Sequence, residues 1–238
     1  MPKVYIHEVV EVDGTQRARY QHHMTANWVP EGSAERRQRC FGVFTLVGST
    51  GPWPRVVNLW EYDSWRTWAT PSRWSCRRPG TGIRPSRSGG SERPRSAGAA
   101  RTWCWWATTR TRVSSTGSRS GGPGRPATCT RWSPPAWAAR SAADEMASAT
   151  AARMADLGIR LVGLWLVAMG AGDRVVALWA VPDWDTWARH ESASASGAPE
   201  RLPGLTSLQR WLLVDAELSP LRTGRQPTAS DRRPLEEL

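Results

Sequence analysis

Alternating hydrophobic and polar positions predict an α+β unit near the start of the chain. The pattern gives a strand, a helix, two paired strands and a second helix, over residues 4–12, 15–27, 41–47, 55–62 and from Ser64 onward. Asp13-Gly14 is a helix start signal, residues 29–32 (VPEG) predict a break, and Ser64 is a suitable N-cap. This β-α-β-β-α order lacks one closing strand.

A second unit is predicted near the other end. The pattern gives a helix, two strands, another helix and a closing strand, over residues 142–157, 159–169, 174–181, from Asp183 onward and 208–218. This α-β-β-α-β order lacks an opening strand. Both missing strands therefore fall between the two units.

The two units resemble each other in sequence. Residues 56–69 (VVNLWEYDSWRTWA) and 175–188 (VVALWAVPDWDTWA) share Val, Val, Leu, Trp, Trp, Thr, Trp and Ala without a gap, at an offset of 119 (175 minus 56). The apolar run at residues 42–47 likewise corresponds to that at 163–168. Self-similarity on this scale indicates duplicated domains, with chance similarity of two tryptophan-rich strands as the alternative.

Composition changes the picture mainly between the two units. The whole chain has a formal net charge of +11, but residues 70–141 contain 14 arginines and one acid, Glu92, so this stretch carries +13 and the rest sums to −2. The same stretch has no Leu, Met, Phe or Tyr, yet six tryptophans and three of the four cysteines. No predicted fold arranges the arginines of this stretch into a binding surface, so we expect no nucleic-acid partner.

The odd composition of residues 70–141 suggests a reading-frame error. Trp and Cys codons become Leu, Val or Met codons when the frame shifts by one base, so a hydrophobic strand read out of frame yields tryptophans and cysteines. Shifted, residues 103–107 (WCWWA) become a buried-strand pattern and residues 129–133 (CTRWS) resemble the opening strand of the first unit. The hypothesis is two compensating shifts in a GC-rich gene; the alternative is a natural disordered linker rich in Arg, Ser, Pro and Gly.

The chain thus divides into four parts. They are a first ferredoxin-like repeat without its last strand, the out-of-frame or disordered segment, a second repeat without its first strand and a disordered tail, at residues 1–69, 70–141, 142–222 and 223–238. Sheets that lack strands expose unpaired edges, so low stability and aggregation are expected. No signal peptide is visible and the longest apolar run, residues 161–169, is too short to span a bilayer, so we expect a cytoplasmic protein with no membrane partner.

The strand-turn-helix around residues 58–62 (NLWEY) resembles the NIPSNAP family of the dimeric α+β barrel superfamily. The resemblance covers residues 3–69 and, more weakly, 142–222. It implies ferredoxin-like domains whose antiparallel sheets pair into a barrel around a cleft. In the second unit Ala177, Ala180 and Val181 replace the polar residues of this motif, so a polar site on that strand is expected only in the first unit.

Strand periodicity selects candidate ligand-binding residues. If the helices cover the face that carries Ile6 and Leu59, the opposite face lines the cleft with an aromatic and polar set: Tyr5, His7, Asn58, Trp60 and Tyr62. Such a mixture suits a small-molecule pocket, to which Trp28 is added from the helix. The alternative is that these residues only make sheet-pairing and interface contacts.

The histidines give weak candidates for catalysis. His22 and His23 diverge by about 100° on a helix and cannot share one metal ion, so no metal site is expected. His7, His22 or His23 could serve as a general base, with Asn58 polarising an oxygen, although most helix histidines are simply exposed to solvent. Cys40 is expected to be a small buried residue rather than a nucleophile.

Two functions remain open from the sequence. The first is a NIPSNAP-like binding or assembly protein that takes a small apolar ligand and can form a homodimer. The alternative is a cofactor-independent monooxygenase or isomerase that acts on an apolar aromatic or polyketide-like substrate. Neither hypothesis requires a cofactor, and a barrel filled by its own side chains would argue against the enzyme.

Overall fold

The computed structural model describes residues 3–48, 54–70, 102–108, 126–133, 148, 150–152, 154–168, 174–196 and 207–234. Eight described strands form one closed antiparallel barrel: β1 (Val4–Glu11), β2 (Arg39–Leu46), β3 (Arg55–Tyr62), β4 (Thr102–Thr108), β5 (Pro126–Ser133), β6 (Arg160–Ala168), β7 (Val175–Ala180) and β8 (Ser207–Asp215). The helical segments are η1 (Gly14–Gln16), α1 (Arg17–His22), η2 (His23–Trp28), α2 (Val29–Arg36), α3 (Trp65–Ala69), α5 (Trp184–Ser196), α6 (Pro220–Thr223) and η4 (Ala229–Asp231).

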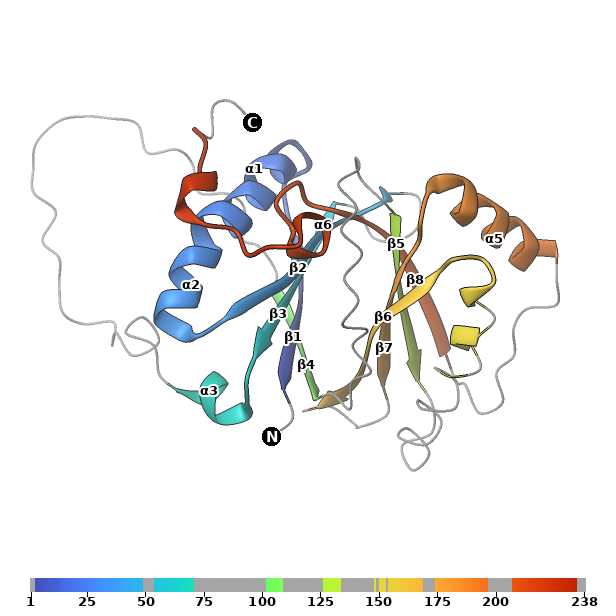
Figure 1. Ribbon diagram of the computed structural model, residues 1–238, viewed down its shortest axis with the longest axis horizontal. Helices are drawn as coiled ribbons and strands as arrows, with labels where there is room; N and C mark the ends of the chain where they lie inside the picture. Colours follow the sequence, from blue (N-terminus) through green and yellow to red (C-terminus); the bar gives the residue numbers. More distant parts are fainter. Residues whose placement is uncertain are drawn as a thin grey trace, which may run out of the picture.

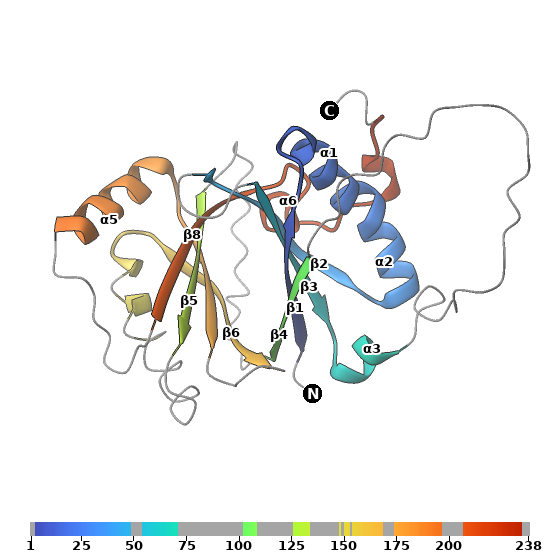
Figure 2. The same cartoon turned by 180° about the vertical axis from the view of Figure 1, so that it is seen from behind.

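The two halves of the barrel have the same strand order. Strands run β4-β1-β3-β2 in the first half and β8-β5-β7-β6 in the second, and the halves join where β2 pairs with β8 and β4 with β6. In Figure 1, α1 and α2 lie outside the first half and α5 outside the second; the reverse view in Figure 2 agrees. Each half therefore places one face of its sheet in the barrel and the other under helices.

Several predicted elements are confirmed. Strand β3 occupies residues 55–62 as expected, and the Ser64 hydroxyl accepts a hydrogen bond from the Thr67 amide at the start of α3. In the second half, Oδ1 of Asp183 accepts from the Thr186 amide at 2.7 Å and so begins α5. Short polar side chains at these positions satisfy amides that have no partner inside the helix.

The expected helix break at residues 29–32 is wrong. The chain stays helical from Arg17 to Arg36, with a π-helical turn, η2, directly before α2. Pro30 falls in the first turn of α2, where its missing N–H is tolerated. Thr25 donates its hydroxyl hydrogen to the Gln21 carbonyl at 2.8 Å, a contact that bends helices.

Strands β4 and β5 correct the expectation that each half lacks a strand. The structure places them at residues 102–108 and 126–133, inside the segment whose residues were thought unable to form strands, and pairs β4 with β1 and β5 with β7. Trp, Cys and Thr are good strand residues even without aliphatic neighbours, and β1 and β7 each offer an edge. The barrel closes, so the unpaired edges that predicted aggregation are absent from the described strands. The other expectations for residues 70–101, 109–125 and 134–141 lie outside the described residues.

Apolar side chains gather in three clusters. One lies in the barrel interior and draws on both halves, with Tyr5, Phe44, Trp165 and Leu213 among its most buried members. A second lies under the helices of the first half and a third under those of the second. Equivalent β-bulges precede Gly42 in β2 and Gly163 in β6, and both glycines leave room for the aromatic ring two residues later.

The C-terminal segment also differs from expectation. Residues 223–234, expected to be a disordered tail, are folded and contact the first half. Gln226 bonds the backbone of Cys40, and Arg233 bonds His22. Turn and capping residues give this short segment local structure of its own.

Candidate functional site

The register of β1 and β3 decides which candidate residues share a face. Ile6 lies opposite Trp60 and His7 lies opposite Leu59, and residues directly opposite in an antiparallel pair point to the same side. The expected grouping of Ile6 with Leu59 is therefore wrong. Tyr5 and His7 face the barrel interior, whereas Asn58, Trp60 and Tyr62 lie under the helices of the first half.

Four polar side chains meet on the helix-covered face, and we call Glu8, Tyr20, Asn58 and Trp60 the helix-side cluster. Oε2 of Glu8 accepts from Nδ2 of Asn58 at 2.9 Å and from Nε1 of Trp60 at 3.1 Å. Nδ2 of Asn58 also donates to the Tyr20 hydroxyl at 2.9 Å. Because a carboxylate only accepts, these bonds fix the orientation of the Asn58 amide and leave its oxygen pointing the other way.

The amide oxygen of Asn58 has no partner within the described part of the chain. Asn58 is 0% exposed, and among the described residues no donor reaches its Oδ1. A buried carbonyl oxygen left unpaired costs about 1–3 kcal/mol relative to a paired one. Such an oxygen is a binding group available to a donor from outside the described residues.

Aromatic side chains belong to the same buried layer as the helix-side cluster. Tyr62 comes from the same strand as Asn58, and Trp28 from η2 packs against the same apolar cluster as Met24. The Arg36 guanidinium lies 5.0 Å from the centre of a Trp28 ring, a cation–π contact at the rim of this layer. The π-helical turn η2 lies in the helical layer above the sheet, and such turns are frequent at functional sites.

The electrostatics of the cluster favour protonated phenols. Burial, with the nearby charge of Glu8, raises the pKa of Tyr20, although its hydrogen bond with Asn58 lowers it in part. Burial also raises the pKa of Tyr62, which Arg36 partly opposes. Tyr20 accepts from Asn58 and keeps its own hydroxyl hydrogen, so it can donate to a bound molecule.

The other two strand candidates, Tyr5 and His7, lie in the barrel interior and have different partners. Tyr5 donates to Oε2 of Glu61 at 2.6 Å, and Lys3 pairs with the other oxygen at 2.7 Å. His7 stacks on Trp211 with ring centroids 6.4 Å apart. The described interior side chains form one buried apolar cluster that draws on both halves.

The two helix histidines, His22 and His23, make their recorded contacts away from the helix-side cluster. His22 is buried, and its Nε2 accepts the backbone N–H of Arg233 at 3.0 Å. His23 is exposed, and its Nδ1 lies 3.5 Å from Nδ2 of Asn27. Cys40 is 2% exposed, and burial raises the pKa of its thiol to about 12, which suits a packed thiol rather than a nucleophile.

The second half has an apolar counterpart to the helix-side cluster. Ala177 and Trp179 occupy the positions of Asn58 and Trp60, and the cluster around them is hydrophobic. Within the described ranges no group of three or more His, Cys, Asp and Glu side chains is arranged to hold a metal ion. The described helices include none with both the length and the apolar character needed to cross a membrane.

Sequence reasoning missed Glu8 and Tyr20. By strand alternation Glu8 shares the face of Ile6, which the sequence predicts to lie under the helices, and Tyr20 falls within the predicted helix at residues 15–27. The available signal was Glu8, an acidic residue among the apolar residues on the helix-covered face of its strand. An acidic side chain at such a position requires a hydrogen-bond partner.

The strand order, with helices on the outer faces, defines the dimeric α+β barrel fold, in which both sheets here come from one chain. Similar solved structures include a candidate monooxygenase from Lactobacillus acidophilus (TM-score 0.55, 7% identity, 91% of this chain and 95% of that chain). An anthrone oxidase-like protein aligns with TM-score 0.55 and 11% identity over 90% and 92% of the two chains. A chlorite dismutase variant from Candidatus Nitrospira defluvii aligns with TM-score 0.53 and 8% identity over 91% and 92%. At these identities the likeness establishes the fold alone.

Neither a protein-family model nor a curated protein sequence matches the chain.

Proposed function

We propose that this protein binds a small, mainly apolar molecule at the helix-side cluster of its first half. The observation that carries the proposal is the fully buried Asn58 oxygen, which has no partner among the described residues. A ligand N–H or O–H placed there would satisfy it, and the rings of Trp28 and Tyr62 would enclose an apolar body. The names of the similar structures, a candidate monooxygenase and an anthrone oxidase-like protein, fit a small-molecule function.

A second candidate function is a cofactor-independent oxygenase or isomerase at the same cluster. It is favoured by the carboxylate, amide and phenol of Glu8, Asn58 and Tyr20, which meet within hydrogen-bonding distance. Glu8 would take a proton from a carbon next to a ketone, and Tyr20 would donate a hydrogen bond to the oxygen that gains charge. In the isomerase Glu8 returns the proton to another carbon; in the oxygenase dioxygen converts CH2 to C=O with release of water. The base would then be Glu8 instead of the histidines first considered.

We also propose that the two halves are NIPSNAP-like repeats. Support comes from their equal strand order, the matched bulges before Gly42 and Gly163, and the edge-to-face tryptophan pairs Trp65–Trp68 and Trp184–Trp187.

We propose in addition that residues 70–141 are read out of frame between two compensating shifts in the gene. Sequencing the gene around Ala69 and Arg140 in independent isolates tests it, and a gene without compensating insertions or deletions would refute it.

Binding is tested with a hydroxyanthrone (called anthrone below), an aromatic ketone whose phenolic O–H can donate to the Asn58 oxygen, by quenching of tryptophan fluorescence in the full chain. We expect saturable binding that Tyr20→Phe weakens by about three- to tenfold, because the variant loses one hydrogen bond of typical strength. Tyr5→Phe is the matched control, since it removes the same hydroxyl from the barrel-interior face. Weaker binding in Tyr5→Phe with none lost in Tyr20→Phe would move the site into the barrel.

A further inference from the structure

Residues 216–234, which we call the C-terminal strap, lie against the helical layer above the helix-side cluster. The strap leaves the end of β8 and crosses to α1 and α2 in Figure 1, where it is drawn in red. Ala216 belongs to the same buried cluster as Trp60 and Tyr62, and η4 packs against η2. The strap therefore reaches the cover of the proposed ligand site from outside.

The strap replaces a strand along part of β2. Strand β8 pairs with β2 only over residues 44–46, and the strap takes up the edge from there. Ala216 donates its amide to the Val43 carbonyl at 2.8 Å, and Ser219 accepts from the Val43 amide at 3.2 Å. The Gln226 side chain accepts from the Cys40 amide at 3.0 Å and donates to the Cys40 carbonyl at 2.7 Å, as the backbone of a neighbouring strand would.

The strap also holds each part of the helical cover. The Arg233 amide donates to His22 at the end of α1, and Nε of Arg232 lies 3.4 Å from the Ala26 carbonyl in η2. Pro30 has no N–H to offer that carbonyl four residues earlier, so the strap supplies a donor that the helix lacks. Arg232 pairs with Glu31 of α2 at 3.3 Å as well, an exposed contact that adds little.

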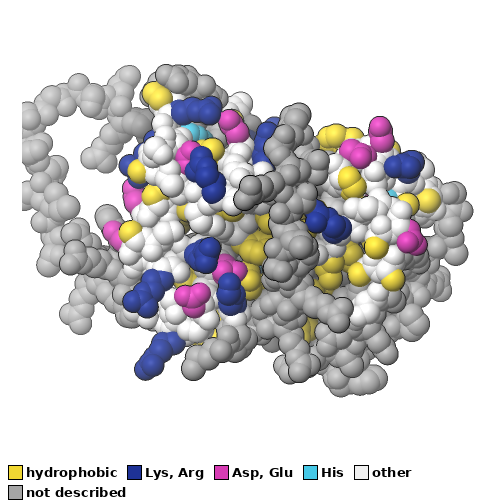
Figure 3. Space-filling model, viewed as in Figure 1, with side chains coloured by type: hydrophobic (Ala, Val, Ile, Leu, Met, Phe, Trp, Pro, Cys, Tyr) yellow, Lys and Arg dark blue, Asp and Glu magenta, His cyan; other side chains and the backbone are white. Residues whose placement is uncertain are grey.

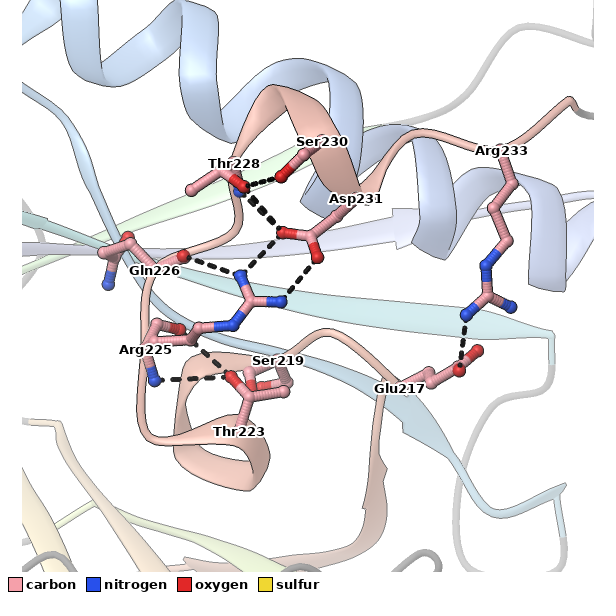
Figure 4. A network of polar contacts seen from close by, with 9 residues as sticks. All are labelled: Glu217, Ser219, Thr223, Arg225, Gln226, Thr228, Ser230, Asp231 and Arg233. Atoms are coloured by element: carbon pink, nitrogen blue, oxygen red, sulfur yellow. Dashed lines mark hydrogen bonds and ion pairs between the residues drawn. The ribbon is translucent and has the colours of Figure 1, made fainter.

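The strap has an internal structure of its own, shown in Figure 4. Gly224 takes the left-handed conformation after α6, with φ of 72°. Arg225 and Asp231 form a two-pronged ion pair, which lowers the pKa of Asp231, and Thr228 forms a capping box with Asp231. Bonds of this kind let the segment move as one unit rather than unravel.

We propose that the C-terminal strap is a releasable latch on the helical cover and regulates access to the helix-side cluster, an inference that rests on the proposed function. Its grip consists mainly of hydrogen bonds to backbone groups and one imidazole. Its buried apolar residues, Ala216 and Pro227, are small, and of its two leucines Leu218 is half-buried and Leu221 is 39% exposed. A segment with so little buried apolar surface opens locally without unfolding the barrel. Release frees α1, η2 and α2 together, and π-helical turns such as the one between them are frequent at functional sites.

The test uses the full chain with Gln226→Ala, which removes both bonds to Cys40, and His22→Ala, which removes the acceptor for Arg233. Gln209→Ala is the matched control, because Gln209 is an exposed glutamine on β8 of the second half. Hydrogen exchange of the Cys40, Val43 and Arg233 amides reports the latch, and stopped-flow fluorescence with anthrone reports access. We expect exchange and both anthrone rate constants to rise about tenfold in the two strap variants, with the equilibrium constant little changed.

The two parts of the inference fail separately. Unchanged exchange in both strap variants overturns the latch, even if anthrone binds. Faster exchange with unchanged anthrone rates overturns regulation of access, because the cover would then open without admitting a ligand. If neither the natural chain nor any variant binds anthrone but exchange is faster in the strap variants, the proposed ligand site is refuted. The strap would then still be a latch on the helical cover.

Discussion

At the scale of single residues, Arg37 shows how backbone conformation and sequence can disagree. Arg37 ends α2 in the left-handed region, with φ of 51°, whereas Gly158 ends the corresponding turn of the second half with φ of 72°. Glycine adopts this conformation without steric cost, and a side chain does not.

We therefore expect Arg37→Gly to stabilise the protein. The left-handed conformation costs a side chain roughly 1 kcal/mol, and the greater freedom of glycine in the unfolded chain offsets about half of it. Urea unfolding should show a gain of about 0.5 kcal/mol. Gly158→Ala is the mirror control and should lose about 1 kcal/mol; a loss in Arg37→Gly would contradict the argument.

Residue identity alone did not determine the faces of the sheet. The candidates Tyr5, His7, Asn58, Trp60 and Tyr62 were found from their residue types, but a one-residue error in register moves every side chain to the other face. The sequence fits either pairing, because both faces of β3 are buried. Only the observed register separates the barrel-interior pair from the helix-side set.

At the scale of elements, glycine in β2 is required by the ring beside it. A Cβ built on Gly42 would lie 2.6 Å from Cζ of Phe44, at the bulge between Cys40 and Gly42. The Phe44 side chain is 1% exposed and has no room to move away.

Gly42→Ala should therefore destabilise the protein by about 1–3 kcal/mol, as overpacking does. Phe44→Leu removes the clashing part of the ring and costs about 1 kcal/mol alone. A double-mutant cycle by chemical denaturation should show that the second substitution rescues part of the first. Simple additivity would mean that the ring is not the cause.

Elements differ in how far the sequence predicts them. Strand β3 and the caps of α3 and α5 were predicted correctly because they combine strong periodicity with local capping residues. The continuous helix through Pro30 was not, since proline in a first helical turn and proline at a break look alike in sequence. Strands β4 and β5 were placed in the right gaps but judged unable to form, because composition was given more weight than β-propensity.

At the scale of the whole molecule, the seam between the halves contains a half-buried carboxyl group with one fully buried oxygen. Asp215 ends β8 opposite Phe44, and its Oδ1 has no partner among the described residues. Burial raises the pKa of Asp215 to about 7, partly opposed by Arg222 and by a hydrogen bond from Ser219 in the strap. On the face shown in Figure 3, acidic and basic side chains are interspersed over the first half.

This pKa predicts how global stability depends on pH. A carboxyl group whose pKa is raised by folding from the ordinary 3.8 to about 7 binds more protons in the native state between these values, so stability falls as pH rises through that window. Asp215→Asn should remove this slope and gain about 2–4 kcal/mol over the natural chain at pH 8, with little difference at pH 4. Urea titrations of both proteins at these two pH values measure it, and a pH-independent difference would contradict the assignment.

The sequence predicts the fold class of the whole molecule but not the strand pairs that close the barrel. The α+β class and the ferredoxin-like order follow from periodicity, and the similar structures establish the barrel fold. The closing pairs β2–β8 and β4–β6 join residues far apart in the chain, which no local pattern reveals. The helix-side cluster likewise depends on a helix–sheet contact between Tyr20 and Asn58.

The pairing of β2 with β8 has a consequence for synthesis. β2 emerges from the ribosome long before β8, because residues 47–206 lie between them. At about 5–20 residues per second, that interval lasts roughly 10–30 s, during which an apolar sheet edge stays open to other chains. Production of this protein should therefore depend on chaperones that shield that edge until the last strand arrives.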